Sequence, residues 1–300
     1  MDATRLRVQD IVDVFSKDGG KIALRDMGSA TESFVKTELA INQSDARLIL
    51  LEEPENHLSF TQSRLLVDQI KKFVQNSGQL IVTTHESLLV TRLNLRNLIW
   101  LSGKNLQLPF SELDAEVAEF FERMDNLNIL QVILSNKLIL VEGPTEYIAI
   151  ESMIKAVTKS DSNSLGIHIM SMHGDLMKRF RPLVKILGTK TLIITDNDGA
   201  EEKMKDRESD EKIYVATPSD TNLFTFEVAL YEENKNFIQN SEIFQKSSKT
   251  EWKKHKNLDK KLVHMLNNKV DYALKYDDLI EKSQIMTPQY IKEGLEWLIN

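Results

Sequence analysis

Five short apolar runs constrain the fold of this 300-residue sequence more than any other feature. Each run is rich in Ile, Leu and Val, ends at polar residues and is too short for a helix, as is typical of buried strands in parallel sheets. The runs cover residues 48–51, 80–82, 98–101, 138–141 and 191–194. Amphipathic stretches between them, such as 62–75 and 146–158, indicate helices. Because strands and helices alternate, the sequence predicts an α/β fold.

The chain is long enough to form two domains, each with a core of its own. We expect the first three strands to belong to a segment over 1–110, followed by an acidic helical connector over 111–136. A second α/β domain is expected over 137–300, and it ends in a helical part with a final helix over 289–299.

Cysteine content, hydropathy and charge exclude several classes of protein. The sequence contains no cysteine, which excludes disulfides and thiolate metal sites and fits a cytoplasmic protein. No apolar run approaches the roughly 18 to 20 residues that a membrane helix needs, and the N-terminus lacks the apolar stretch of a signal peptide. We therefore expect no membrane partner. The net charge of −7 gives no general attraction to DNA, so any such contact must rest on local basic patches or bound cations.

Two of the predicted strands end in carboxylates. The run 138–141 is followed by Glu142, a glycine turn and a predicted helix that carries Glu146 one turn later. The run 191–194 leads into Asp196 and Asp198, which point the same way if the strand stays extended. Open α/β sheets bind their ligands in the crevice at the carboxyl ends of the strands, so we expect these acids to share one crevice.

Four carboxylates in one crevice repel each other unless cations neutralise them. All are oxygen donors without a nearby His or Cys pair, which favours Mg²⁺ or Mn²⁺ over zinc. Two such ions could clamp the attacking water and the leaving oxygen of a phosphodiester. The alternative is that these acids only cap helices and solvate strand ends, but the two motifs in this order favour the metal site.

A further acidic strand end lies in the N-terminal segment. Glu52 and Glu53 follow the run 48–51 and precede the string Pro-Glu-Asn-His-Leu at 54–58, while His85 follows the run 80–82. In nucleotide hydrolases, acids at such a strand tip hold magnesium and polarise the attacking water. The string resembles the Walker B and D-loop junction of ABC-type ATPases of the DNA-repair and OLD (overcoming lysogenization defect) groups.

The same resemblance assigns roles to further residues of this segment. It implies that His85 is the switch histidine that senses the γ-phosphate, and it places Gly28 and Ser29 in the signature loop, although a helix N-terminus capped by Ser29 or Thr31 explains that stretch equally well. No G-x-x-x-x-G-K-[ST] phosphate-binding loop occurs in the sequence. We therefore expect ATP to act here only if another lobe supplies that loop, either from a longer protein or in trans.

The string Val-Glu-Gly-Pro-Thr-Glu at 141–146, together with the later acids, resembles the TOPRIM domain of topoisomerases, primases and OLD-family nucleases. Coupled to the ATPase-like segment, it is most similar to the OLD family of ATP-linked endonucleases. The resemblance implies an incomplete ABC-type ATPase lobe followed by a TOPRIM domain, which has a Rossmann-like parallel sheet. It further implies two Mg²⁺ or Mn²⁺ ions held by five acids, namely Glu142, Glu146, Asp196, Asp198 and Glu227.

The resemblance also implies catalytic roles for four residues, namely Glu142, Asp196, Asp198 and Lys269. Lys269 stands in the string Lys-Val-Asp-Tyr-Ala, which is similar to the family pattern K-G-x-F-A except that Val270 replaces the glycine. A lysine near the scissile phosphate would stabilise charge on the phosphoryl oxygens. His173 is expected to be structural.

A lysine cluster lies between 246 and 261 and includes Trp252 and His255. Lys253, Lys254 and Lys256 are candidates for contacts with a phosphate backbone, and Trp252 could stack on a base. The competing interpretation, which is slightly favoured, is that these lysines form a solvated face of a helix.

The resemblance implies an endonuclease of the OLD type that acts on DNA with water as the nucleophile, in phage defence or DNA repair. A homo-oligomer or an ATPase partner is expected. The alternative is a non-catalytic nucleic-acid-binding or assembly module of an ABC-ATPase complex, which the missing phosphate-binding loop favours. A primase-like component is disfavoured because no zinc-binding cluster accompanies the acids, and a topoisomerase because no tyrosine has a recognisable setting as the nucleophile.

Overall fold

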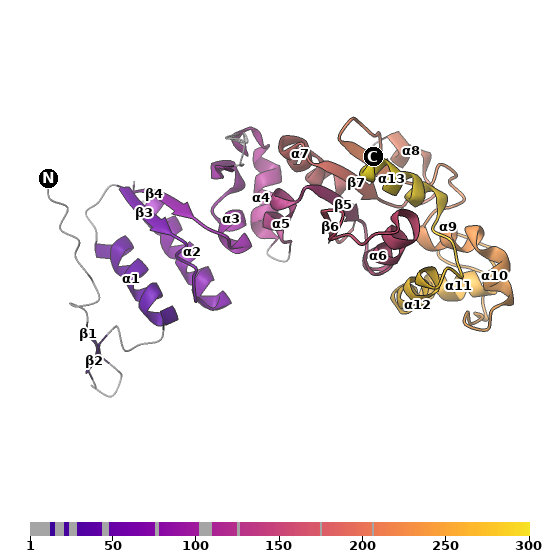
Figure 1. Ribbon diagram of the computed structural model, residues 1–300, viewed down its shortest axis with the longest axis horizontal. Coiled ribbons are helices and arrows are strands. Elements are labelled where there is room, and N and C mark those ends of the chain that lie inside the picture. The colour runs from indigo at the N-terminus through magenta and orange to yellow at the C-terminus, as the bar shows by residue number, and fades with distance from the viewer. Residues whose placement is uncertain are drawn as a thin grey trace. The chain divides into compact units, whose positions relative to one another are not determined.

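The computed structural model describes residues 13–15, 21–23, 29–43, 48–75, 78–101, 110–124, 127–174, 176–205 and 207–300. The chain divides into two compact units, Met1–Leu130 and Gln131–Asn300 (Figure 1). Within the described residues, no helix is long and apolar enough to cross a membrane.

The N-terminal unit combines short strands with helices. Strands β1 (Asp13–Phe15) and β2 (Lys21–Ala23) pair antiparallel, and β3 (Leu48–Glu52) and β4 (Gln79–Thr83) pair parallel. Its α-helices are α1 (Ser29–Gln43), α2 (Phe60–Gln75), α3 (Ser87–Arg92) and α4 (Ala115–Arg123), and its 3-10 turns are η3 (Leu95–Asn97) and η4 (Phe110–Glu112). Helix α5 (Ile129–Leu134) spans the boundary between the two units. Leu66, Val67 and Ile70 on one face of α2 form a core with Ile41 of α1 and Leu89 of α3.

One face of the β3–β4 sheet is apolar and exposed. Leu50 of β3 lies opposite Ile81 of β4, and their side chains are 69% and 54% exposed. Parallel sheets are normally covered on both faces. Among the described residues, nothing covers this face of the sheet.

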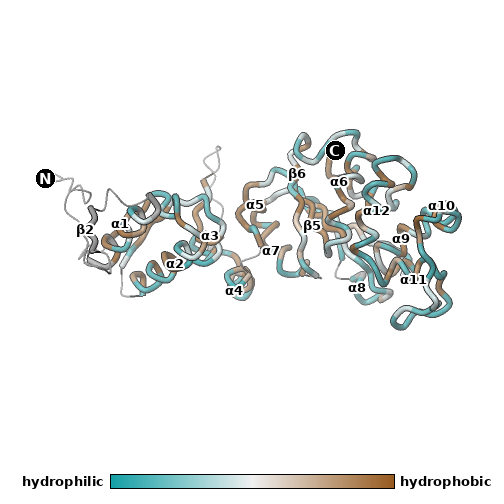
Figure 2. Tube along the Cα trace, turned by 90° about the horizontal axis from the view of Figure 1, so that it is seen from below, coloured by the Kyte–Doolittle hydropathy of each residue, from teal (hydrophilic) through white to brown (hydrophobic). Residues whose placement is uncertain are grey.

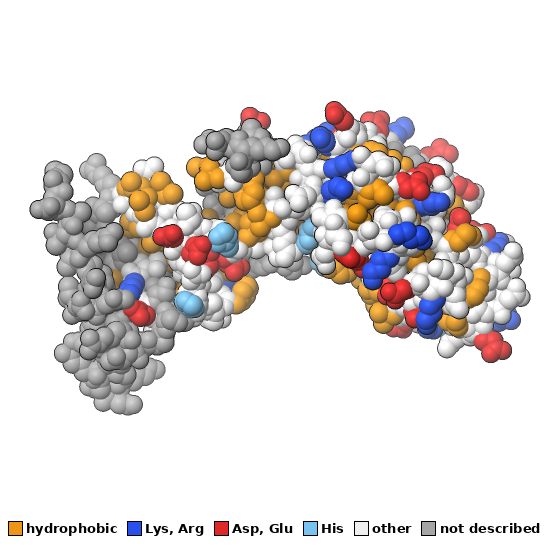
Figure 3. All heavy atoms as spheres, in the orientation of Figure 1, with side chains coloured by type: hydrophobic (Ala, Val, Ile, Leu, Met, Phe, Trp, Pro, Cys, Tyr) orange, Lys and Arg blue, Asp and Glu red, His pale blue; other side chains and the backbone are white. Residues whose placement is uncertain are grey.

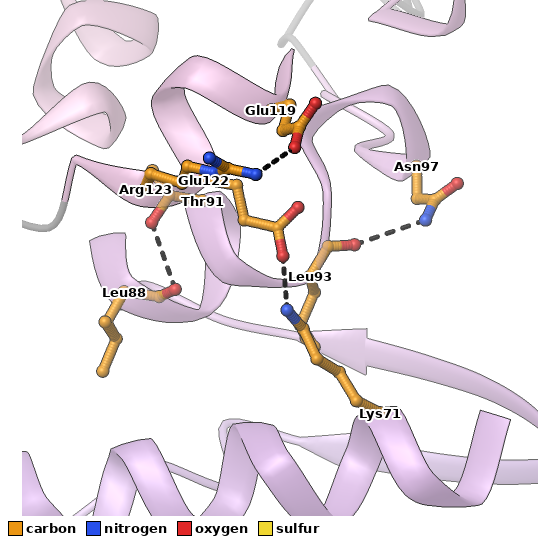
Figure 4. A network of polar contacts seen from close by, with 8 residues as sticks. All are labelled: Lys71, Leu88, Thr91, Leu93, Asn97, Glu119, Glu122 and Arg123. Atoms are coloured by element: carbon orange, nitrogen blue, oxygen red, sulfur yellow. Dashed lines mark hydrogen bonds and ion pairs between the residues drawn. The ribbon is translucent and has the colours of Figure 1, made fainter. Parts of the chain in front are cut away.

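Polar contacts join the helices that follow α2 (Figure 4). Lys71 of α2 pairs with Glu122 of α4, and this ion pair joins two helices. Within α3, Thr91 Oγ1 donates a hydrogen bond to the carbonyl of Leu88 at 3.2 Å. The Lys71–Glu122 pair is partly exposed, so it is expected to contribute at most about 1 kcal/mol. The packing of the apolar faces therefore holds these helices together.

The strand expected at 98–101 is wrong. These residues follow the 3-10 turn η3 and form no strand of a described sheet. The side chains of Ile99 and Leu101 are exposed. The run is apolar, but the described residues do not bury it, so hydrophobicity alone misidentified it as a core strand.

The C-terminal unit is built on a four-stranded parallel sheet in the order β6-β5-β7-β8. The strands are β5 (Lys137–Val141), β6 (Ile167–Ser171), β7 (Lys190–Ile194) and β8 (Ile213–Ala216). The central strand β5 is hydrophobic along most of its length in Figure 2, and its residues 138–141 are fully buried. This confirms the predicted parallel sheet with β5 and β7 in its middle.

Helices cover the sheet of this unit and extend beyond it. They are α6 (Pro144–Thr158), α7 (Met177–Leu187), α8 (Glu201–Lys205), α9 (Phe226–Glu233), α10 (Lys235–Asn240), α11 (Lys260–Asn267), α12 (Lys269–Glu281) and α13 (Gln289–Ile299). Helix α12 packs along α6, and α13 packs on β7 and β8. Gly294 permits this approach, because a Cβ there would lie 2.5 Å from Leu192 Cδ1. The predicted final helix agrees with α13.

Candidate active site

The register of β5 and β7 brings Glu142 next to the strand end of β7. Val141 pairs with Ile194, and the N–H of Glu142 donates to the carbonyl of Ile194 at 3.2 Å. Glu142 Oε2 accepts hydrogen bonds from Thr195 Oγ1 at 2.6 Å and from the N–H of Asp196 at 3.1 Å. The first acid motif therefore fixes the start of the second.

A buried asparagine shapes the turn between Asp196 and Asp198. Asn197 Oδ1 accepts from the N–H of Gly199 at 2.8 Å, and its Nδ2 donates to the carbonyls of Pro218 and Asp220 at 2.9 and 3.0 Å. Asp198 adopts a left-handed φ of 49°, a conformation that Asp tolerates better than most residues. The turn directs Asp196 inward, where it is buried, whereas Asp198 is more exposed and pairs with Lys203.

Glu146 reaches the same crevice from the first turn of α6. It is buried, and a Cβ at position 143 would lie 3.1 Å from Glu146 Oε2, so Gly143 leaves room for the carboxylate to fold back over the turn. Pro144 occupies the first turn of the helix, where its missing N–H costs nothing. Helix α6 thus presents its first acid to the strand ends.

Glu227 and Lys269 form the fourth side of the crevice. Glu227 on α9 is 1% exposed, and its Oε2 accepts from Lys269 Nζ at 2.6 Å. Its other oxygen, Oε1, is buried without a hydrogen-bond partner. Glu227 lies more than eighty positions from Glu142 in sequence, and only the fold brings the two together.

The crevice is strongly electronegative. Burial, followed by repulsion from Glu227, raises the pKa of Glu146 to about 7. Burial, followed by repulsion from Glu146, raises the pKa of Asp196 well above its usual value. Burial lowers the pKa of Lys269, but the charge and hydrogen bond of Glu227 together with the charges of Asp196 and Glu146 outweigh this effect, and the net shift is upward. These shifts show that the carboxylates lack enough positive charge.

The donor set fits a hard divalent cation. Four carboxylates gather at one sheet edge around one lysine, and the partnerless Glu227 Oε1 is a free oxygen ligand inside that group. Among the described residues, no three Asp, Glu or His side chains already stand in an arrangement that could hold a metal ion. Glu142 is turned toward Thr195, and Glu227 toward Lys269. Ion binding therefore requires these carboxylates to exchange their present partners for the cation.

The acids open into a pocket of about 460 Å³ that has a second, basic and aromatic wall. Glu142, Asp196 and Asp198 line one side together with Lys269. The other lining residues are Phe224, Thr225, Trp252, Lys253, Lys254 and His255. Acidic and basic side chains therefore face the same space, as a polyanionic ligand bound through cations would need.

The predicted lysine cluster is not one surface. The favoured interpretation as a helix face is wrong for most of it, because α11 begins only at Lys260. Lys253 and Lys254 occupy a turn and line the pocket, and Lys256 is exposed nearby but does not line it. Lys261 is buried and donates from Nζ to three backbone carbonyls, which gives it a structural role.

The ATPase-like acids and histidine of the N-terminal unit also come together. Glu52 ends β3, and the next residue, Glu53, adopts a left-handed φ of 41°. Glu53 Oε1 lies 3.0 Å from His85 Nε2, and its Oε2 accepts from Asn56 Nδ2 at 2.8 Å. Glu55, which the sequence analysis did not single out, accepts from the N–H of His85 at 2.9 Å. The structure therefore brings Glu53 and His85 together, and their role in sensing a nucleotide stays a prediction.

The signature-like stretch is only partly described. Gly28 lies outside the described residues, and Ser29 is the first residue of α1. Their predicted contact with a nucleotide stays a prediction.

In the C-terminal unit, the sequence analysis missed Thr195 and Asn197. Both are polar residues directly after an apolar strand, and this position is a signal that could have identified them.

Comparison with known proteins matches both halves of the chain. Residues 133–198 match the family described as "Overcoming lysogenization defect protein-like, TOPRIM domain", and residues 2–91 match the family described as "AAA domain, putative AbiEii toxin, Type IV TA system". No curated protein matches the chain in sequence.

Among solved structures, the chain is similar to C-terminal regions of OLD proteins. The region from Xanthomonas campestris pv. campestris is 16% identical, with a TM-score of 0.34, and the match covers 56% of this chain and 94% of that one. The region from Burkholderia pseudomallei is 16% identical, with a TM-score of 0.35, and the match covers 55% and 97%.

Proposed function

This chain carries an OLD-type TOPRIM domain behind an AAA-type segment, and we propose that it is a metal-dependent endonuclease that hydrolyses phosphodiester bonds of DNA. The observation that supports this most directly is the buried group of acids at the carboxyl ends of β5 and β7. Glu146, Asp196 and Glu227 are buried and interact with the charge of Lys269. Glu142, Asp196 and Asp198 line a pocket that also contains basic residues. A buried negative charge of this size is costly unless it binds cations.

The proposed ligands of two Mg²⁺ or Mn²⁺ ions are the five acids Glu142, Glu146, Asp196, Asp198 and Glu227. When bound, the ions activate a water molecule and stabilise the leaving oxygen. Glu142 and Thr195 hold Asp196 in place through backbone and side-chain hydrogen bonds. Lys269 Nζ, held at the crevice by Glu227, supplies positive charge for the phosphoryl oxygens.

Incubation of supercoiled plasmid with the chain tests the proposal. We expect nicked or linear products with Mg²⁺ or Mn²⁺ and none with EDTA, because the acids need cations to accept a phosphodiester. The competing function is a non-catalytic nucleic-acid-binding or assembly module, which the absence of a preformed metal arrangement in the described residues favours. Metal-loaded protein that slows the migration of DNA in a gel without cutting it would establish that alternative.

We propose that ATP acts only after a lobe with a phosphate-binding loop completes the N-terminal unit, either from a partner or from another part of a longer protein. Two observations support this proposal. Glu53 and His85 are paired at the strand ends of β3 and β4, as a γ-phosphate site needs, and the apolar face with Leu50 and Ile81 is uncovered. DNA, a second copy of the chain or an ATPase subunit are the partners that this function implies, with phage defence or DNA repair as the setting.

The chain alone is expected to show no ATP turnover above that of the Glu53→Gln variant, because its sequence contains no G-x-x-x-x-G-K-[ST] loop to bind the phosphates. Phosphate release from radiolabelled ATP measures this. Turnover by the purified chain that disappears in Glu53→Gln would show that the N-terminal unit is complete without another lobe.

A further inference from the structure

The segment 250–258 forms a tight hairpin beside the acids. The N–H of Trp252 donates to the carbonyl of His255 at 2.9 Å, and the N–H of His255 donates back to the carbonyl of Trp252 at 2.9 Å. Leu258 closes the base of the hairpin by donating to the carbonyl of Thr250 at 2.8 Å. Lys253 and Lys254 therefore stand at the tip, where Lys253 takes a left-handed φ of 51°.

Three nearly parallel rings hold this hairpin against the rest of the unit. The ring of His255 stacks on Phe224 with centroids 3.5 Å apart and an interplanar angle of 9°. The ring of Trp252 lies 6.0 Å from that of Phe224 at 16°. Trp252 is half-buried and lines the pocket, so it keeps aromatic surface toward the site. The arrangement is a rigid aromatic platform and not a loose surface loop.

Two lysine ammonium groups lie over the Trp252 ring. Lys253 Nζ lies 4.3 Å from the centroid of the Trp252 ring, and Lys269 Nζ lies 5.7 Å from it. A strand of nucleic acid offers both partners that such a surface binds, since its bases stack on aromatic rings and its phosphates attract ammonium groups. On the face drawn in Figure 3, by contrast, the Lys and Arg side chains of this unit are interspersed with acidic ones.

Backbone contacts tie the platform to the metal-ligand candidates. The carbonyl of Phe224 accepts from the N–H of Asp198 at 3.1 Å, and the N–H of Phe226 donates to Asp196 Oδ1 at 2.8 Å. Gly199 packs close to the His255 ring, since a Cβ there would lie 3.7 Å from His255 Cε1. A base held on the platform is therefore held at a fixed position relative to both aspartates.

We propose that Trp252 is a specificity-determining residue that stacks on an unpaired nucleobase next to the cleaved phosphate, and that the site consequently prefers single-stranded or frayed DNA to a fully paired duplex. A base inside a duplex already stacks on its neighbours and cannot lie on the Trp252 ring unless it leaves the helix, which costs its stacking and pairing energy. This inference rests on the proposed function, because it assumes that the acids act on a nucleic-acid strand.

The test measures binding and not cleavage, so it can fail separately from the nuclease proposal. The full chain carries Asp196→Asn so that it does not cleave the DNA during the measurement. It is titrated in the presence of Mg²⁺ against a labelled single strand and against the matched duplex. Fluorescence anisotropy gives the two dissociation constants. We expect the single strand to bind more tightly than the duplex.

Trp252→Leu in that background is expected to weaken single-strand binding about 5- to 100-fold, the range for loss of one base–aromatic stack, and to change duplex binding little. Trp252→Phe should retain most of the affinity, because it keeps a ring. Leu preserves apolar packing at this half-buried position, so a folded variant is expected. Lys254→Ala should weaken binding of both DNAs and reduce their salt dependence, whereas Lys292→Ala on α13 serves as the charge control without effect.

Equal affinity of the parent chain for single strand and duplex, or a Trp252→Leu variant that binds the single strand like its parent, overturns the inference. In either case cleavage of plasmid by the wild-type chain would leave the nuclease proposal standing. Absence of binding of both DNAs also overturns the inference, and the plasmid assay with the wild-type chain then decides the nuclease proposal by itself.

Discussion

Replacing Asp196 with asparagine is expected to reduce metal-dependent DNA cleavage by more than about 100-fold, since loss of a single charge-stabilising group at a reaction centre costs about 10²- to 10³-fold in rate. The substitution is nearly isosteric. The amide oxygen can still accept the hydrogen bond from the N–H of Phe226, now made to Asp196 Oδ1 at 2.8 Å. The fold should therefore survive while one anionic ligand is lost. A plasmid-nicking time course with Mn²⁺ measures the rate.

Glu142→Gln should have a comparable effect on the same rate, because the glutamine oxygen can still accept from Thr195 and from the N–H of Asp196. Glu211→Gln is the matched control, since it removes an exposed acid of the same unit that lines no pocket described for the site. If either active-site variant cuts plasmid at the wild-type rate, the substituted residue has no role in the reaction.

Lys269→Met is expected to destabilise the C-terminal unit by about 3 kcal/mol, the lower end of the range for removing one partner of a buried ion pair. Glu227 is 1% exposed and would lose its only partner, whereas the Lys269 side chain is 32% exposed, which keeps the effect from being larger. Urea unfolding of the metal-free chain measures this change. In a Trp100→Phe background the remaining tryptophans, Trp252 and Trp297, both report on the C-terminal unit.

The physical reason is testable by a second substitution. Glu227→Gln combined with Lys269→Met should recover at least about 1 kcal/mol relative to Lys269→Met alone, because the unpaired buried charge is gone. Lys292→Met, at an exposed ion pair of α13, should change stability by no more than about 0.5 kcal/mol. A Lys269→Met chain as stable as wild type would mean that Glu227 does not depend on this lysine.

The sheet and most of the acid group could be predicted because short stretches of consecutive residues indicate them. The apolar runs that became β5 and β7 end directly in Glu142 and Asp196, so strand assignment and site assignment were one inference. The neighbouring strand β6 was missed because His168 and Ser171 interrupt its apolar residues, and β8 was missed because it has only four residues. Their place in the sheet is set by partners that are distant in sequence.

Features that rest on long-range contacts could not be derived from the sequence pattern. Glu227 was selected only through family resemblance, and its buried pair with Lys269 spans forty-two positions. The stacking of His255 on Phe224 carries no local signature at all. A run of lysines was taken as a helix face because charge periodicity does not distinguish a solvated helix from a hairpin whose tip is fixed by backbone hydrogen bonds.

Direct titration of the metal-free chain with Mn²⁺ tests the central claim that these acids, which are distant in sequence, jointly hold divalent cations. Binding is measured by calorimetry or by the loss of the electron paramagnetic resonance signal of free Mn²⁺. The account predicts saturable binding by the wild-type chain that is weakened at least about 10-fold in Asp196→Asn and in Glu227→Gln and unchanged in Glu211→Gln. The same Mn²⁺ affinity in wild type, Asp196→Asn and Glu227→Gln, or no saturable binding at all, would contradict it.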